Sequence, residues 1–307
     1  MQKFIGTGVA LVTPFKEDLS VDFTALIQLV NYNIENGTDY LVINGTTGES
    51  GTITKEEKQE IIDVVIQTNN KRLPLVLGVG GNNTALVLEE LKSRDFSGLD
   101  GILSVAPYYS KPTQEGFYQH FKAIANATDL PVILYNVPGR TAKNMDPETT
   151  LRLANDFKNI VGVKEAGNNM QQYYALLKDK PADFLVISGD DDLALGVVLA
   201  GGSGVISVIG QAFPKQFSTM INHALQGNNK EGYVVHYKMM EIVAAIFEEN
   251  NPAGIKSVLQ ELGICRNEVR LPLVKASQAL SSKVSQMVAN FQSSNFSVYL
   301  FSSYKDS

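Results

Sequence analysis

The most informative stretch of the sequence is Ile160-Val161-Gly162-Val163-Lys164, a short apolar run that ends on a cation. Fully buried strands of alternating β/α proteins are continuous apolar runs of this kind. A lysine at the end of such a strand lies partly in the apolar core, where burial disfavours the ammonium form and can make the amine a nucleophile. The simpler interpretation is that the long stem of Lys164 only carries its charge to water.

Seven similar runs occur along the chain, and longer amphipathic stretches separate them. The eight predicted strands are 8–12, 40–44, 75–79, 102–106, 132–135, 160–164, 184–188 and 204–208. The helical stretches include 22–35, 55–68, 84–95, 114–127 and 147–156. Eight such units predict an α/β protein with a closed (β/α)8 TIM barrel, although an open doubly wound sheet alternates in the same way.

The glycine pattern decides between these two folds. The glycine-rich stretch at 78–83 lacks the G-x-G-x-x-G spacing of a dinucleotide site, and no phosphate-binding G-x-x-x-x-G-K-S/T occurs. The barrel is therefore favoured, and we expect no cofactor.

The strands stop after the eighth unit, and residues 230–249, 253–262 and 272–291 read as helices. We therefore expect a barrel carrying the active site at 1–227, a C-terminal helical domain at 228–292 and a tail of no assigned role at 293–307.

Composition narrows the class of protein. The 307 residues carry a net charge of −6 and a sequence pI near 5.2, which argues against nucleic-acid binding. No run approaches the ~18 apolar residues of a membrane span, and the first residues lack the pattern of a signal peptide. The single cysteine, Cys265, fits a reducing compartment, so we expect a cytoplasmic protein that binds neither membrane nor nucleic acid.

In a TIM barrel the loops after the strands build the active site. The predicted strand ends lead into reactive residues at 44–50, at 107–109, at 135–141 and at Lys164. Tyr135 is either a core aromatic or a proton shuttle beside the amine. Arg140 is either a solvated loop cation or a two-point clamp for a carboxylate. The turn with Gly45 and Gly48 either only reverses the chain or frees backbone N–H groups for an anion.

A metal site or a hydrolase triad is not expected. The run Asp190-Asp191-Asp192 precedes a predicted helix, so we interpret it as an N-cap and first turn rather than as metal ligands. The three histidines fall in helical stretches, and no G-x-S-x-G elbow is present.

Five motifs in order resemble the dihydrodipicolinate synthase family: G-T-T-G-E-S at 45–50, P-Y-Y at 107–109, Y-N-V-P-G-R-T at 135–141, G-V-K-E-A at 162–166 and G-V-I-S-V at 204–208. The similarity runs from about residue 6 to residue 275. It implies a Schiff-base-forming lyase that condenses pyruvate with L-aspartate 4-semialdehyde, in diaminopimelate and lysine biosynthesis. The product is 4-hydroxy-tetrahydrodipicolinate.

The resemblance also implies roles for single residues. Lys164 forms the Schiff base with pyruvate, whose methyl group then gives an enamine. Tyr135 is the proton donor and acceptor, with Thr46 and Tyr109 as a proton relay. The positions that contact the substrates are Thr47 and Ile206 for pyruvate, and Arg140 for the carboxylate of the semialdehyde. Tyr109 reaches a neighbouring subunit's site in this family, whose members are commonly homotetramers.

Related lyases of the superfamily leave an alternative function. N-acetylneuraminate lyase and the 2-keto-3-deoxy sugar-acid aldolases share the lysine and tyrosine but use another second substrate. Arg140 favours the synthase, because a small anionic aldehyde requires a cation whereas a long polyol requires room and hydrogen bonds.

Two departures from the family pattern stand out. N-P-A-G-I-K at 251–256 replaces N-P-I-P-V-K, far in sequence from the chemistry, and we expect it to leave the catalytic assignment intact. The positions of the family's allosteric lysine site are Ser50, Lys58, Asn82, Leu86 and Tyr108. Inhibited relatives often carry histidine and glutamate where this chain has Lys58 and Leu86. We therefore expect weak or absent inhibition by lysine, because the effector's ammonium loses its carboxylate partner.

Overall fold

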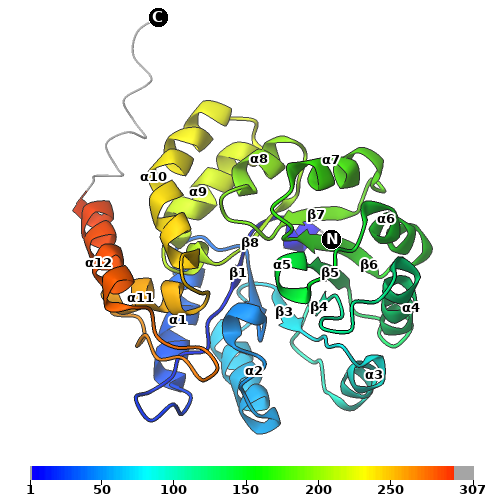
Figure 1. Cartoon of the computed structure of the whole chain (residues 1–307), viewed down its shortest axis with the longest axis horizontal. Helices are drawn as coiled ribbons and strands as arrows, with labels where there is room; N and C mark the ends of the chain where they lie inside the picture. The colour runs from blue at the N-terminus through cyan, green and yellow to red at the C-terminus, as the bar shows by residue number, and fades with distance from the viewer. Residues whose placement is uncertain (1, 294–307) are drawn as a thin grey trace, which may run out of the picture.

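A computed structural model describes residues 2–293 of the chain. Eight parallel strands form a closed barrel in sequence order, and Figure 1 shows the helices arranged around them. They are β1 (Gly6–Ala10), β2 (Tyr40–Ile43), β3 (Leu75–Gly78), β4 (Gly101–Val105), β5 (Val132–Asn136), β6 (Ile160–Glu165), β7 (Leu185–Ser188) and β8 (Gly204–Ser207). The pairs Gly6↔Gly204 to Val9↔Ser207 join β8 to β1 and close the barrel. The predicted barrel is confirmed, and each predicted strand overlaps an observed one.

Helices surround the barrel. They are α1 (Phe23–Glu35), α2 (Lys55–Asn69), α3 (Thr84–Ser93), α4 (Gln114–Ala125), α5 (Pro138–Thr141), α6 (Pro147–Asp156), α7 (Met170–Asp179), α8 (Ala194–Leu199) and α9 (Pro214–Leu225). Short 3-10 helices lie at Gln2–Phe4, Thr46–Gly48 and Ile209–Gln211. Local signals set the helix starts: Thr54 Oγ1 accepts from Glu57 N at 3.2 Å while Glu57 Oε2 accepts from Thr54 N at 2.9 Å, a capping box that begins α2.

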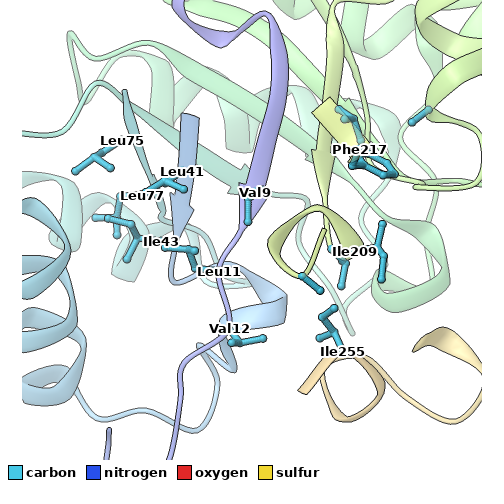
Figure 2. Packing of buried hydrophobic residues seen from close by; sticks show 14 of the residues in the cluster. Val9, Leu11, Val12, Leu41, Ile43, Leu75, Leu77, Ile209, Phe217 and Ile255 are labelled. Carbon is cyan, nitrogen blue, oxygen red and sulfur yellow. The ribbon is translucent and has the colours of Figure 1, made fainter. Parts of the chain in front are cut away.

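Two apolar clusters explain why the barrel is stable. One fills the barrel interior and includes Val42, Val76, Ile133 and Ile206. The larger cluster lies between the strands and the surrounding helices. Figure 2 shows part of it, with Leu41 and Ile43 of β2 beside Leu75 and Leu77 of β3. Because both faces of every strand are buried, the strands read as continuous apolar runs.

Three further helices form the predicted C-terminal helical domain, which Figure 1 shows beside α1 and α9. They are α10 (Asn229–Phe247), α11 (Ala253–Glu261) and α12 (Gln278–Ser293). The third begins later than the predicted residue 272, because Ser277 Oγ accepts from Leu280 N at 3.1 Å and so caps the helix at that point. Ser293, predicted to begin the tail, still belongs to α12, and the rest of that tail lies outside the described residues. The boundary near residue 227 stays a prediction.

Candidate active site

Lys164 and Tyr135 lie together at the carboxyl ends of two neighbouring strands. They are direct partners in the register of β5 and β6, so their side chains leave the same face of the sheet. Lys164 is 5% exposed, and its Nζ lies 4.5 Å from the centre of the Tyr135 ring. The barrel therefore holds an amine and a phenol side by side in a site largely shielded from water.

The turn after β2 carries the two predicted threonines. Thr46 and Thr47 begin a 3-10 helix that ends at Gly48, and the following Glu49 takes a left-handed conformation with φ of 55°. Thr13 Oγ1 donates to Gly48 O at 2.6 Å, which fixes the turn to the end of β1. Thr47 is buried and Thr46 is half-buried. The turn thus brings two hydroxyl groups to the same end of the barrel as Lys164.

Arg140 and the threonine turn line one cleft of about 510 Å³. Arg140 lies on the short helix α5 after β5, and its side chain is exposed to solvent. Its Nη2 donates to Asn251 O at 3.3 Å. The cleft lining also contains Thr46, Ser50 and Tyr108 from the predicted set, together with Asn251 and Pro252. A guanidinium at the rim of such a cleft is suited to bind a carboxylate.

Three other predicted positions differ in exposure. Ile206 of β8 is fully buried in the barrel interior. Tyr109 follows β4 and is 88% exposed, with a left-handed φ of 69°. Tyr108 beside it is 42% exposed. Within this subunit Tyr109 does not line the cleft described above, among the residues that the structure describes.

The predicted allosteric positions fall into two groups. Ser50 and Tyr108 line the cleft. Lys58 lies on α2, Asn82 precedes α3 and Leu86 lies on α3 with 62% exposure. Within residues 2–293, these last three are not part of that lining.

The aspartate run after β7 does not cap the next helix, so the N-cap interpretation was wrong. The helix α8 has Leu193 at its N-cap with no side-chain hydrogen bond. Asp191 instead accepts from Val208 N at 3.0 Å and Ile209 N at 2.8 Å, and it is 2% exposed. Burial raises the pKa of Asp191 to about 6, opposed by these N–H groups and by the charge of Lys164. Asp191 therefore holds the end of β8 next to the amine.

A buried carboxylate that the sequence reading missed lies directly behind Lys164. Glu165 accepts from Asn136 Nδ2 at 2.9 Å and from Gln172 Nε2 at 2.8 Å, and Asn136 is its partner in the β5–β6 register. Burial raises the pKa of Glu165 to about 7, opposed by these two amides. The network ties the ends of β5 and β6 together one residue beyond the Tyr135–Lys164 pair.

The C-terminal domain also reaches the threonine turn, although residues 251–256 are far from that turn in sequence. Asn251 Nδ2 donates to Thr47 Oγ1 at 3.0 Å. Lys256 of α11 forms a fully buried ion pair with Glu49 at 2.6 Å. Arg270 N donates to the other carboxylate oxygen of Glu49 at 3.0 Å. Sequence reasoning could not pair these residues, because each partner is about 200 residues away from the turn.

Known proteins match the chain over almost its whole length. A sequence profile described as the Dihydrodipicolinate synthetase family matches residues 3–291. The chain belongs to this family. A relative named 4-hydroxy-tetrahydrodipicolinate synthase, from Flavobacterium psychrophilum, is 58% identical over 284 residues, which cover 92% of this chain and 97% of the relative.

Solved structures of this family match the fold closely. The dihydrodipicolinate synthase of Acinetobacter baumannii, complexed with pyruvate, has a TM-score of 0.90 at 38% identity and covers 93% of this chain and 98% of its own. The enzyme from Cyanidioschyzon merolae, with lysine bound, has a TM-score of 0.90 at 38% identity, and the match covers 94% of this chain and 98% of that one.

Metal-ligand clusters and helices able to cross a membrane are both absent from the described residues. Residues 2–293 contain no group of three or more histidine, cysteine, aspartate or glutamate side chains placed to hold a metal ion. No helix in that part of the chain has the length and apolar character needed to cross a membrane.

Proposed function

We propose that Lys164 is the amine that forms the Schiff base with pyruvate in the reaction for which the relatives are named. The chain has 4-hydroxy-tetrahydrodipicolinate synthase activity and acts on pyruvate and aspartate semialdehyde. The observation that carries the role of Lys164 is its position: a buried strand-end amine whose Nζ lies 4.5 Å from the Tyr135 ring. A shielded amine beside a phenol has both a nucleophile and a proton carrier within reach of one substrate.

The proposed sequence of steps begins at Lys164. Lys164 Nζ bonds to the ketone carbon of pyruvate, and the carbonyl oxygen leaves as water. The resulting iminium withdraws electrons, so the methyl group loses a proton and becomes an enamine. Its terminal carbon bonds to the aldehyde carbon of the semialdehyde. The amine of the semialdehyde then displaces Lys164 as the ring closes.

The surrounding residues supply binding and proton transfer. Tyr135 carries protons to and from the carbonyl oxygen, with Thr46 next in the relay. Thr47 donates to the pyruvate carboxylate, and Ile206 forms an apolar wall beside it. Arg140 binds the carboxylate of the semialdehyde from the cleft rim. Support for this last assignment is the position of a cation on a cleft of about 510 Å³, a size suited to a small substrate.

We further propose that the protein acts as a homotetramer in the cytoplasm. Tyr109 would complete the relay in a neighbouring subunit's site. Its 88% exposure supports this, because an aromatic ring held out from the surface in a left-handed backbone conformation is suited to meet another surface.

Borohydride trapping tests the proposed role of Lys164. Incubation with pyruvate and borohydride should add the mass of a reduced pyruvate adduct, which peptide mapping should locate on Lys164. Lys164→Ala should form no adduct. The conservative control Tyr135→Phe should still form one, but more slowly, because the proton carrier is lost and the amine is kept. An undiminished adduct in Lys164→Ala would refute the assignment.

A further inference from the structure

The side chain of Asn251 meets the threonine turn from outside the barrel. Asn251 lies in the segment between α10 and α11, and it is 5% exposed. Its Nδ2 lies 3.0 Å from Oγ1 of Thr47, which is 3% exposed. Because both side chains are buried, water does not compete for this hydrogen bond, and the contact holds the Thr47 hydroxyl in one orientation.

The direction of this hydrogen bond decides what the hydroxyl can do. A threonine hydroxyl has one proton to donate and an oxygen that accepts. When Asn251 Nδ2 donates to that oxygen, the proton of Thr47 stays available for an anionic ligand. Asn251 Oδ1, for its part, has no hydrogen-bond partner within the described residues. With the amide in the opposite orientation, Thr47 would donate its proton to Asn251 Oδ1, and its hydroxyl could not donate to a carboxylate.

Two more contacts hold Asn251 and the turn in place. The backbone carbonyl of Asn251 accepts from Arg140 Nη2 at 3.3 Å. The ion pair between Lys256 and Glu49 fixes the same turn two residues beyond Thr47, and both side chains are fully buried. The C-terminal domain therefore contacts the threonine turn at two separate points.

We propose that Asn251 is a positioning residue, which orients the Thr47 hydroxyl so that it donates to the carboxylate of pyruvate. This inference rests on the proposed function, in which Thr47 binds that carboxylate. It assigns the C-terminal domain a part in binding the first substrate, through Thr47. The effect should fall on KM for pyruvate rather than on kcat, because the carboxylate contact is equally strong in the ground state and the transition state.

Two substitutions of Asn251 separate the orientations of its amide. Asn251→Ala should raise KM for pyruvate about tenfold, as expected for one lost hydrogen bond, and should change kcat less than about twofold. Asn251→Asp should raise this KM further, because a carboxylate accepts the Thr47 proton and repels the substrate's charge. KM for the semialdehyde should change less than about twofold in Asn251→Ala, because the backbone carbonyl facing Arg140 remains.

A double-mutant cycle tests whether the effect acts through Thr47. Thr47→Val removes the hydroxyl and should itself raise KM for pyruvate. Adding Asn251→Ala to Thr47→Val should produce less than about a twofold further rise. The matched control is Ser257→Ala in α11, which removes a buried hydroxyl whose hydrogen bond, among the described residues, goes to Ala253 O at 3.2 Å, and it should leave both KM values unchanged.

The outcomes distinguish this inference from the proposed function. A parent protein that forms no pyruvate adduct on Lys164 would contradict the proposed function and this inference with it. A normal adduct together with an unchanged pyruvate KM in Asn251→Ala would overturn the role of Asn251 alone. An unchanged KM in Asn251→Asp, or a full additional effect in the Thr47→Val background, would overturn it as well.

Discussion

Removing one partner of the buried ion pair between Lys256 and Glu49 should lower the free energy of unfolding by a large amount. Both side chains are fully buried, and their charged atoms lie 2.6 Å apart. Lys256 Nζ also donates to Glu268 O at 2.7 Å and lies 4.2 Å from the centre of the Phe15 ring. The ammonium is thus held by a carboxylate, a carbonyl and an aromatic face.

The magnitude follows from this geometry. At an effective dielectric constant of about 20, unit charges at the 2.6 Å separation attract each other by about 6 kcal/mol. Lys256→Met keeps the length of the side chain and removes the charge, which leaves Arg270 N as the hydrogen-bond partner of the Glu49 carboxylate among the described residues. Structural relaxation around the unpaired Glu49 recovers part of the lost attraction. We therefore expect Lys256→Met to lower the free energy of unfolding by about 3 to 5 kcal/mol.

Removing both charges should cost less than removing one. The double variant Glu49→Gln/Lys256→Met leaves no uncompensated buried charge, and its remaining cost is the unpaired carbonyl of Glu268, about 1 to 2 kcal/mol. The assay is unfolding in guanidinium chloride followed by circular dichroism. The control is Lys283→Met, which removes an exposed ion pair with Glu248 and should change stability by less than about 1 kcal/mol. A Lys256→Met variant as stable as the parent would refute the reasoning, and so would a double variant no more stable than Lys256→Met.

Three further predictions follow from the site. Arg140→Ala should raise KM for the semialdehyde about 100-fold through loss of a charged two-point contact, and the pyruvate adduct should form as in the parent; an unchanged KM would contradict the clamp. Millimolar lysine should inhibit the parent less than about twofold, since Leu86 offers the effector's ammonium no carboxylate, whereas Lys58→His/Leu86→Glu should be inhibited more; strong inhibition of the parent would disprove this. Because burial raises the pKa of Glu165 from its usual 4.5 to about 7, the folded state binds the extra proton between those values. The free energy of unfolding should therefore fall as pH rises from about 4.5 to 7, by up to about 3 kcal/mol. Denaturant titrations at a series of pH values should show that this free energy falls less steeply with pH in Glu165→Gln than in the parent; an equal dependence on pH would contradict the shifted pKa.

Local sequence pattern predicted the elements well, because their causes are local. The strands are apolar on both faces, so each appears as a continuous run, and the capping box of Thr54 and Glu57 marks the start of α2 without help from distant residues. The predicted start of the last helix at residue 272 was too early, because the hydroxyl of Ser277 accepts from Leu280 N and caps α12 there. The role of Asp191 was missed because an aspartate before a helix usually caps it, while here the partners lie after β8.

The positions of the proposed reacting groups could be predicted from sequence, because a barrel places the carboxyl end of every strand on the same face. That rule places Lys164 and Tyr135 at the same end of the barrel, and the family resemblance then suggests their roles. Their supporting residues do not follow from it, because hydrogen bonds such as that between Asn251 and Thr47 join positions 204 residues apart. Periodicity and short motifs do not predict which side chains will form a hydrogen bond across so long a separation in sequence.

The sequence by itself determined the eight strands, the barrel they form and the cation at the end of β6, because apolar burial and strand alternation act on neighbouring residues. Only the tertiary structure decided that the C-terminal domain contacts the threonine turn, that Glu165 is buried behind Lys164 and that Asp191 holds the end of β8. These are polar contacts inside a packed interior. Their strength comes from the exclusion of water, and that exclusion exists only once the barrel and the C-terminal helices have packed together.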